Sequence, residues 1–417
     1  MEPPNKKTRC NDGPAMSHSF PDLSTLPEPL LIHILSFMDP EEAVQTCILS
    51  KTWRNLWTCL PSLRFNNCRF KGTDAAFVPF VTNMLYFRGA SKLDTFRLCW
   101  NVGALHRDIC QIHVSYVSAW IFSALSCKPL VISLYLYGFT NLKLPLALFT
   151  SASLEQLELH LYDPSNKDIE PKYVNLPNLK KLKLRNFTLN NPVMQTMLSG
   201  CPLLEELSLL RCSMNFGEMK SELLRSLTII NCQGSEVVEI FMPSLISLHL
   251  EDSSPGKTKL TFRNTPSLVK ASVCYLTFME PNFPGEGLDF FNCLTTVIDL
   301  ELCGSGVKGL LEKKILNCPI FDNLKQLTCG PWSINEELDV LCQLLQHTPK
   351  LEKLTILHDK TLAIPGNPKK KSATGKIPFR CDQLKAIEIM HSDPSGAHEL
   401  VDILLRNISH SERKDLM

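Results

Sequence analysis

A six-residue pattern, Leu-x-x-Leu-x-Leu, recurs along most of this chain. Its clearest copies follow one another at intervals of 20 to 25 residues and begin at Leu154, Leu179, Leu204, Leu224, Leu245 and Leu268. Leucines two residues apart point to the same side of an extended strand. A single short strand cannot bury such a side, so neighbouring copies must stack against one another. The pattern therefore predicts a stack of short strands.

Weaker copies extend the series in both directions, with intervals that stretch to about 27–38 residues. They begin at Leu60, Leu93, Val131, Leu324, Leu351 and Leu384, and another is expected around Thr296–Leu302. A period of 20–29 residues is that of leucine-rich repeats. The prediction is an α/β fold, a curved solenoid with parallel strands on its concave face and helices or loops outside. Residues 192–202 are expected to form one outer helix, closed by Gly200 and Pro202.

The composition is that of a globular protein and gives little further information about function. The 417 residues are 44% hydrophobic, with a formal net charge of +1 and a mean hydropathy of −0.01. This balance gives no sign of a nucleic-acid surface or a polybasic membrane face. No stretch reaches 18 consecutive apolar residues, so no membrane span is expected.

The segment before the repeats combines three short helical patterns in about forty residues. Thr25 is the expected N-cap of the first, Asp39 and Glu42 form a capping-box pair for the second, and Ser50 is expected to cap the third. Ala43, Val44, Cys47 and Ile48 fall on one face of the second helix. So few residues bury little among themselves, although each large apolar side chain is worth about 1.5–3 kcal/mol when buried. The surplus must pack against the next domain or against a partner, and the pattern alone leaves both open.

The segment contains the run Leu26-Pro27, Leu30-Leu31 and Ile34-Leu35-Ser36-Phe37, followed by Ala43-Val44, Leu49-Ser50-Lys51, Trp53-Arg54 and Leu56-Trp57. This run resembles an F-box, and more narrowly the N-terminal box of large plant families that carry leucine-rich repeats behind it. Met38, Thr52 and Cys47 are mild departures from the usual residues. The resemblance implies that the box binds the small Skp-type adaptor of a cullin-based ubiquitin ligase. The residues it implies for adaptor binding are Leu26, Pro27, Leu30, Leu31, Ile34, Leu35, Val44, Leu49, Trp53, Leu56 and Trp57.

A second resemblance lies at the C-terminal end. Residues 347–356 and 379–389 are similar to the FBD segment of many plant F-box/repeat proteins, with a helix expected over His398–Ile408. Members of that family continue into one more strand, whereas this chain stops at Met417. The expected organisation is a polar tail (1–21), the F-box (22–65), the solenoid (66–346) and the FBD-like repeats (347–417). A basic loop at 366–376 is interpreted as a solvated insertion rather than an anion site.

The chain shows no recognisable catalytic or metal-binding apparatus. Its 17 cysteines include no Cys-x-x-Cys pair, and most lie at apolar positions where cysteine acts as a small hydrophobe. We expect free thiols in a reducing compartment, because no apolar leader precedes them. His398 and Glu399 begin a zinc-protease pattern, but Asp402 occupies the place of the second histidine. The expectation is a non-enzyme without cofactor or metal.

Residues that alternate with the strand leucines should line the concave face and meet a partner there. The candidates are Glu158, His160, Lys181, Lys183, Arg185, Ser208, Thr228 and His249. Their mixed sign argues against nucleic acid, which needs a sustained basic track. It also weakens the comparison with hormone receptors of this type, whose phosphate-bearing cofactor requires several convergent basic residues. A protein or peptide target fits best.

These features together predict a substrate-recruiting subunit of a Skp-cullin-F-box ubiquitin ligase, cytoplasmic and/or nuclear, with no nucleic-acid or membrane partner. Its box would bind the Skp-type adaptor and, through it, a cullin, while the repeats hold a protein target. Lys6, Lys7 and Arg9 form only a short basic cluster that a nuclear signal could use. Two alternatives stay open, a leucine-rich-repeat scaffold without ligase function and an F-box receptor that depends on a small molecule.

Overall fold

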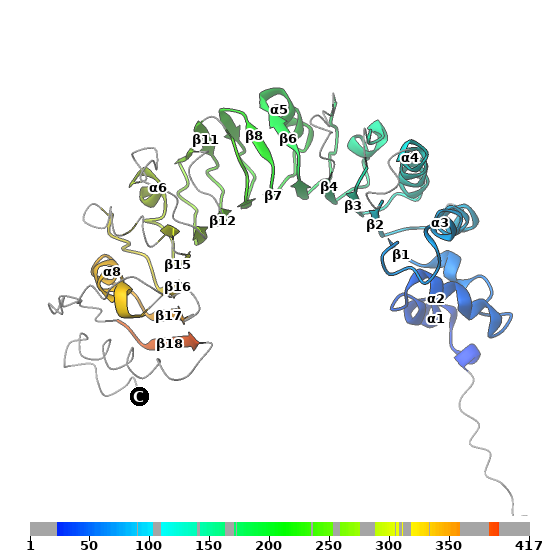
Figure 1. The fold of residues 1–417 in the computed structure, drawn as a ribbon, viewed down its shortest axis with the longest axis horizontal. Helices are drawn as coiled ribbons and strands as arrows, with labels where there is room; N and C mark the ends of the chain where they lie inside the picture. The colour runs from blue at the N-terminus through cyan, green and yellow to red at the C-terminus, as the bar shows by residue number, and fades with distance from the viewer. Residues whose placement is uncertain are drawn as a thin grey trace, which may run out of the picture.

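The computed structural model describes residues 23–358 and 383–391, apart from residues 90, 103–109, 140–141, 163–170, 172, 235–236, 253–258, 276–287, 305, 308–310, 312–317 and 333. The described chain forms a long arc with the N-terminal helices at one end and strand β18 at the other (Figure 1). The predicted tail (1–21), the basic loop (366–376) and the helix over residues 398–408 lie outside the described residues.

Thirteen of the described strands form one parallel sheet along the inner side of the arc, in chain order. They are β1 (Ser62–Asn66), β2 (Thr95–Asn101), β3 (Val131–Tyr137), β4 (Gln156–Tyr162), β5 (Lys181–Arg185), β7 (Glu206–Leu210), β10 (Ser226–Ile230), β12 (Ser247–Asp252), β14 (Lys270–Tyr275), β15 (Asp299–Cys303), β16 (Gln326–Trp332), β17 (Lys353–His358) and β18 (Ala386–His391). The predicted solenoid is confirmed, and the sheet continues without a break across the expected boundary at residue 346.

The leucines of the repeat form an unbroken buried ladder behind this sheet. Leu157 and Leu159 pair in register with Leu182 and Leu184 on the next strand, and all four are at most 4% exposed. All the pairings in this sheet are parallel, so the chain starts each strand from the same end of the sheet. The copy expected around Thr296–Leu302 is β15, whose Leu300 and Leu302 continue the ladder.

The repeat assigned to Val131 was placed two residues out of register. Val131 pairs with Gln156 and is half-buried on the concave side, whereas Ile132 pairs with Leu157 and is fully buried. The error arises because Leu134 and Leu136 match the Leu-x-Leu end of the pattern, and a shift of two residues keeps each side chain on the same face of the strand.

The outer side of the arc changes its structure along the chain. Near the N-terminus it consists of the long helices α3 (Asp74–Arg88) and α4 (Cys110–Ser126), then of the 3-10 turn η5 (Leu146–Phe149) and α5 (Asn191–Gly200). In the middle, short strands pair with each other instead: β6 (Thr188–Asn190) with β8 (Ser213–Asn215), and β11 (Val237–Phe241) with β9 (Glu218–Lys220) and β13 (Lys259–Arg263). Helices α6 (Leu288–Cys293) and α8 (Ile334–Gln346) return towards the C-terminal end.

The outer helices are fixed to the sheet by caps and aromatic contacts. The predicted helix at 192–202 is confirmed as α5, where the side chain of Asn190 accepts a hydrogen bond from the backbone N–H of Val193 at 2.9 Å. Trp120 of α4 stacks on Trp100 of β2, with ring centroids 5.0 Å apart, and donates to the hydroxyl of Thr82 on α3. Both neighbouring helices are thereby tied to one strand.

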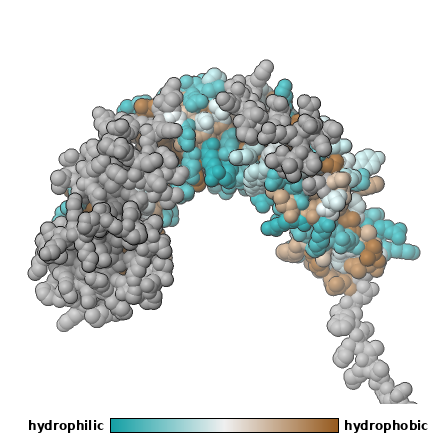
Figure 2. All heavy atoms as spheres, viewed as in Figure 1, coloured by the Kyte–Doolittle hydropathy of each residue, from teal (hydrophilic) through white to brown (hydrophobic). Residues whose placement is uncertain are grey.

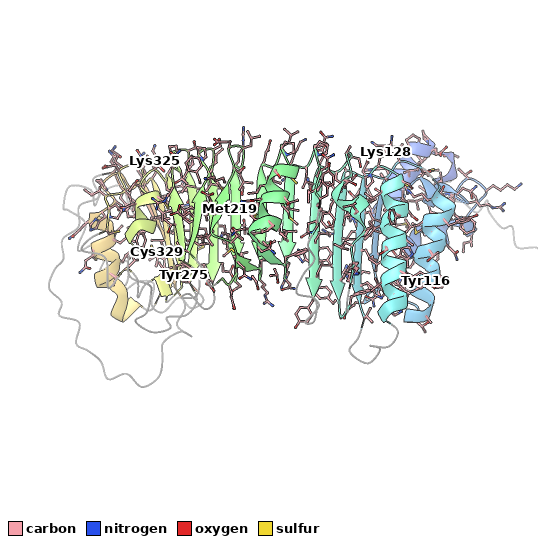
Figure 3. The ribbon with its side chains drawn as sticks, turned by 90° about the horizontal axis from the view of Figure 1, so that it is seen from above. Tyr116, Lys128, Met219, Tyr275, Lys325 and Cys329 are labelled. Atoms are coloured by element: carbon pink, nitrogen blue, oxygen red, sulfur yellow. The ribbon has the colours of Figure 1, made fainter. Side chains whose placement is uncertain are left out.

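The turn that follows each of several strands requires a left-handed backbone. Asn186, Arg211 and Asn231 come directly after β5, β7 and β10, with φ of 62°, 50° and 51°. After β3 the same place is taken by Gly138, with φ of 79°. Viewed from the outer side, the strands stand side by side along the arc, with Lys128 and Lys325 at the edge where strands begin and Tyr275 towards the edge where they end (Figure 3).

Two helices and three short 3-10 turns make up the box. They are η1 (Leu23–Thr25), α1 (Glu28–Leu35), α2 (Pro40–Gln45), η2 (Thr46–Ile48) and η3 (Leu56–Cys59). Thr25 was expected as the N-cap of the first helix, but it ends η1 and Pro27 occupies the cap position. Asp39 does precede α2, yet its side chain makes no capping bond; Glu42 accepts from the backbone of Asp39 instead.

The prediction of a third helix after Ser50 is wrong. Residues 51–55 form turns, followed only by the 3-10 turn η3. Trp53 and Leu56 are 3% and 5% exposed, so both reach the core from this irregular segment. Tertiary packing of these two side chains overrides the helical preference of ten residues bounded by Pro61.

The left-handed turn after β3 leads to a matched pair of substitutions. In Gly138→Ala the new methyl group would collide with the carbonyl oxygen of Val102, whereas in Gly89→Ala it would meet nothing within 4 Å, although φ is 61° there. Both should lose about 1–3 kcal/mol, because each backbone lies at a positive φ that side chains other than glycine rarely adopt. Gly138→Ala should lose about 1–3 kcal/mol more for the overlap. Chemical denaturation of the two variants measures the difference, and equal losses would contradict the proposed clash.

Candidate functional site

Burial divides the eleven residues expected to bind the adaptor into three groups. Leu31, Leu35, Trp53 and Leu56 are buried. Leu26, Ile34, Val44 and Trp57 are half-buried, and Pro27, Leu30 and Leu49 are exposed. The buried group cannot meet a partner directly while the box is folded, so its contribution is to hold the others in position.

One face of the box packs on the start of the solenoid. Helix α1 contacts η3, and α2 contacts both η3 and β1. The buried leucines of α1 belong to the same continuous core as Leu63 of β1. An ion pair between Lys71 and Glu42, 3.0 Å long, links the loop after β1 to α2. Part of the apolar surplus of the box is therefore used within the chain.

The rest of that surplus is on the surface. Leu30, Phe37, Ile48 and Leu49 are 50%, 78%, 84% and 63% exposed. Hydrophobic atoms gather at the end of the arc formed by α1 and α2, in contrast to the hydrophilic middle of the inner face (Figure 2). Exposed aliphatic and aromatic side chains in one small unit are typical of a protein-interaction surface.

Phe37 and Ile48 were not among the predicted adaptor residues. Ile48 was assigned to the same helical face as Ala43, which is fully buried. Helix α2 ends at Gln45 and continues as the 3-10 turn η2, which advances 3.0 rather than 3.6 residues per turn. This change rotates Ile48 away from the core. Phe37 follows the end of α1, a place that helical periodicity does not reach.

The eight predicted target-binding residues all lie on strands of the inner sheet, at positions that alternate with the buried leucines. Register places Glu158, Lys183, Ser208, Thr228 and His249 in one row across β4, β5, β7, β10 and β12. A second row holds His160 and Arg185, and a third holds Lys181. Their location on the concave face follows from the pleat.

Glu158 is the centre of the most connected polar cluster on this face. Its carboxylate accepts a hydrogen bond of 2.7 Å from the hydroxyl of Tyr135 and lies 2.9 Å from the Lys183 ammonium. Arg97 places its guanidinium 3.9 Å from the same carboxylate and 5.3 Å from the centre of the Tyr135 ring. Strands β2, β3, β4 and β5 thus each contribute one side chain.

This environment shifts the protonation of two groups. Burial alone would raise the pKa of Glu158, but contacts from His160, Tyr135 and Lys183 outweigh it and hold that pKa well below its usual range. Burial and the bond to Glu158 raise the pKa of Tyr135. Glu158 is therefore ionised and Tyr135 neutral at physiological pH, an arrangement suited to holding side chains still rather than to proton transfer.

His160 is on the predicted face but is not open to a partner. It is 6% exposed, with its ring 4.5 Å from that of Tyr135 and its Nε2 atom 3.0 Å from Glu158. The expectation that His160 contacts a target is corrected: it lies beside Tyr135 on the neighbouring strand and supports the cluster. Tyr135 and Arg97 were missed, although the alternation within β2 and β3 could have revealed them.

Fourteen cysteines of the described part of the chain form no disulfide bond. Cys212 and Cys232 are buried below successive turns, where each thiol donates to strand carbonyl oxygens at 3.3–3.5 Å. Burial raises the pKa of Cys201 to about 12, which suppresses its thiolate.

Two further surveys cover only the part of the chain that the structure describes. No three His, Cys, Asp or Glu side chains there are grouped as metal ligands. None of the helices seen there is long and apolar enough to span a bilayer.

The Glu158 cluster predicts a pH-dependent contribution to stability. Glu158→Gln should lower the free energy of unfolding by about 2 kcal/mol at pH 7, because hydrogen bonds to a charged group are lost. Because the pKa of Glu158 in the folded chain is lower than the ordinary 4.5, ionised Glu158 stabilises the fold above pH 4.5. This stabilisation is lost as the pH falls from 4.5 through the lowered pKa. The difference from the unmodified chain should therefore shrink below about pH 4.5.

Thermal unfolding of both forms between pH 3 and pH 7 measures this difference. Glu155→Gln is the control, because Glu155 pairs with Lys180 at 3.0 Å but both side chains are about half exposed. Glu155→Gln should lower the free energy of unfolding by less than about 1 kcal/mol. An unchanged difference across the pH range would contradict the role given to Glu158.

Comparison with known proteins agrees with the arrangement of a box before a solenoid. The F-box domain family matches residues 23–65, and the family of LRR repeats of the FBD-associated F-box protein At5g56370 matches residues 128–283. The second match ends before residue 347, so the FBD-like nature of the C-terminal repeats stays a prediction.

Similar proteins come from two plants. The putative F-box/LRR-repeat protein At4g15060 of Arabidopsis thaliana is 30% identical over 81% of this chain and 79% of its own length. F-box/LRR-repeat protein At4g14096 of the same plant is 29% identical over 80% and 72% of the two chains. The MEIOTIC F-BOX protein MOF of Oryza sativa subsp. japonica is 27% identical over 94% and 84%. This chain therefore belongs to the family of plant F-box/LRR-repeat proteins.

Proposed function

We propose that this protein recruits a target protein to a Skp-cullin-F-box ubiquitin ligase. The box binds the Skp-type adaptor, the adaptor joins a cullin, and the concave face of the solenoid holds the target. The general role of such subunits follows from family membership and is non-catalytic. The observation that carries the proposal for this chain is the set of exposed apolar side chains on its box.

The division of the box into buried and exposed residues supports adaptor binding. Leu31, Leu35 and Trp53 fix the box to itself and to the solenoid, so the exposed side chains are held in place before a partner arrives. Pre-organisation of this kind reduces the entropy lost on binding. Full burial of Leu30 or Ile48 against an adaptor would contribute about 1.5–3 kcal/mol each.

The target would be positioned rather than chemically changed by this chain. A box at one end of the arc and a partner surface along its inner side would hold a bound target at a set distance from the adaptor (Figure 1). Such tethering raises the effective concentration of the target near the ubiquitin-charged enzyme. We place this function in the cytoplasm, the nucleus or both.

A small-molecule receptor has less support in the geometry of the concave face. A phosphate-bearing cofactor requires convergent cations, but Lys183 and Arg97 both approach the carboxylate of Glu158, and Lys181 pairs with Glu206 at 2.9 Å. A scaffold without ligase function would differ from the proposed ligase subunit only in that no cullin joins its complex and its target is not degraded.

Adaptor binding is tested with the double variant Leu30→Glu/Ile48→Glu. Two carboxylates in an apolar interface should abolish co-purification of the Skp-type adaptor, a loss of at least about 100-fold in affinity. The matched control is Phe122→Glu/Leu146→Glu, which changes two apolar residues outside the box that are 55% and 56% exposed. This control should bind normally. Undiminished binding by the first variant would refute the adaptor surface.

Ligase function is tested by comparing the intact chain with Leu30→Glu/Ile48→Glu in cells treated with a proteasome inhibitor. Affinity purification and mass spectrometry should recover the adaptor and a cullin only with the intact chain. Proteins held by the repeats should be recovered with both, and their ubiquitinated forms should decline with the variant. Recovery of the adaptor without a cullin, and no change in ubiquitination, would favour the scaffold.

A further inference from the structure

One row of the concave face changes character from basic to apolar to acidic within four neighbouring strands. Arg185 of β5 pairs in register with Leu210 of β7, Leu210 with Ile230 of β10, and Ile230 with Glu251 of β12. Side chains at these positions share the face that lines the inside of the arc, opposite the buried leucines. The two apolar residues are half-buried and thus still accessible.

The charges at the two ends of this row are available to a partner. Arg185 makes no ion pair with any residue that the structure describes. Glu251 lies 3.8 Å from His249, and its side chain is 33% exposed. Other charged pairs on this face neutralise each other across adjacent strands at 2.8–2.9 Å, for example Lys270 with Asp299 and Lys353 with Glu388.

The surroundings extend the same polarity along the arc. Concave positions of β1 to β7 carry five basic and two acidic side chains, a net charge of +3: Arg64, Arg97, Lys181, Lys183 and Arg185, with Glu158 and Glu206. Concave positions of β10 to β18 carry two basic and four acidic side chains, a net charge of −2: Lys270 and Lys353, with Glu251, Asp299, Glu301 and Glu388. The half nearer the box is therefore positive and the far half negative.

The dimensions of the row match an extended peptide. Three strand intervals separate Arg185 from Glu251, which is about 14 Å at the usual spacing of neighbouring strands. Alternate residues of an extended peptide point to the same side, and residues i and i+4 are about 13–14 Å apart. An acidic residue, an apolar residue and a basic residue at i, i+2 and i+4 would meet Arg185, then Leu210 and Ile230, then Glu251.

We propose that this row binds an extended segment of a partner protein with the pattern acidic-x-apolar-x-basic, whose acidic end lies on the side of the box. The inference deepens the proposed function and rests on it, since it takes the concave face as the target surface. The apolar side chain packs between Leu210 and Ile230, and opposite charges at the two ends select the partner. Partners of uniform charge are repelled at one end of the row.

Four fluorescent peptides serve as probes, each with a five-residue centre between Gly-Ser flanks. The matching centre is Glu-Ser-Leu-Ser-Lys; the others are Lys-Ser-Leu-Ser-Lys, Glu-Ser-Leu-Ser-Glu and Glu-Ser-Ser-Ser-Lys. Fluorescence anisotropy measures their affinity for the full chain. The matching peptide should bind about tenfold more tightly than each of the others.

Charge reversals should change which peptide is preferred. Arg185→Glu should prefer the peptide with two lysines, and Glu251→Lys the peptide with two glutamates. Ile230→Ser should weaken the three leucine-containing peptides alike. Arg263→Glu, on β13 of the outer layer, removes an equally basic residue from outside the row and should keep the original preference.

A folding defect would weaken all peptides without exchanging their order, so the exchange of preference is the decisive result. Equal binding of all four peptides by the unmodified chain would overturn the inference, as would an Arg185→Glu chain that still binds the adaptor and keeps the original order of preference. Adaptor binding, measured on the same preparations, separates the two proposals. A chain that binds the adaptor but shows no charge preference refutes only this inference, and a chain that fails to bind the adaptor refutes the proposed function.

Discussion

The buried leucine ladder is the contact on which the rest of this structure depends. Each strand supplies two or three apolar side chains that pack against the same positions of the strands on either side and share one core with the outer layer. Stacking in exact register therefore fixes every concave side chain relative to its neighbours. The ion pairs, the Glu158 cluster and the row from Arg185 to Glu251 all follow from this register.

The ladder also explains why the box can present apolar residues to a partner. A continuous core runs from Leu31 and Leu35 of α1 into the first strand, so the box gains its stability from the solenoid. Leu30, Phe37 and Ile48 are not needed for that core and stay on the surface. A unit of about forty residues would otherwise have too little buried surface to fold and bind with the same side chains.

The fold was largely predictable because its signal is repeated. Every copy of the leucine pattern corresponds to a strand, and only the register of β3 was wrong, because a shift of two residues leaves the same face of the strand buried. Within the box, α1 and α2 were predicted but the segment from Ser50 to Leu60 was not, since burial of Trp53 replaced a helix by turns. Of the site residues, the concave positions followed from alternation, whereas the roles of Tyr135 and His160 required contacts between strands.

The sequence by itself determined the solenoid, the place of the box and the residues that line the concave face, because periodicity of two and a repeat of 20 to 25 residues are local properties of the chain. Only the tertiary structure decided which apolar residues of the box remain exposed and which charges on the concave face are neutralised. Those outcomes depend on distances between residues far apart in sequence. Register across the sheet sets these distances, and no single repeat contains them.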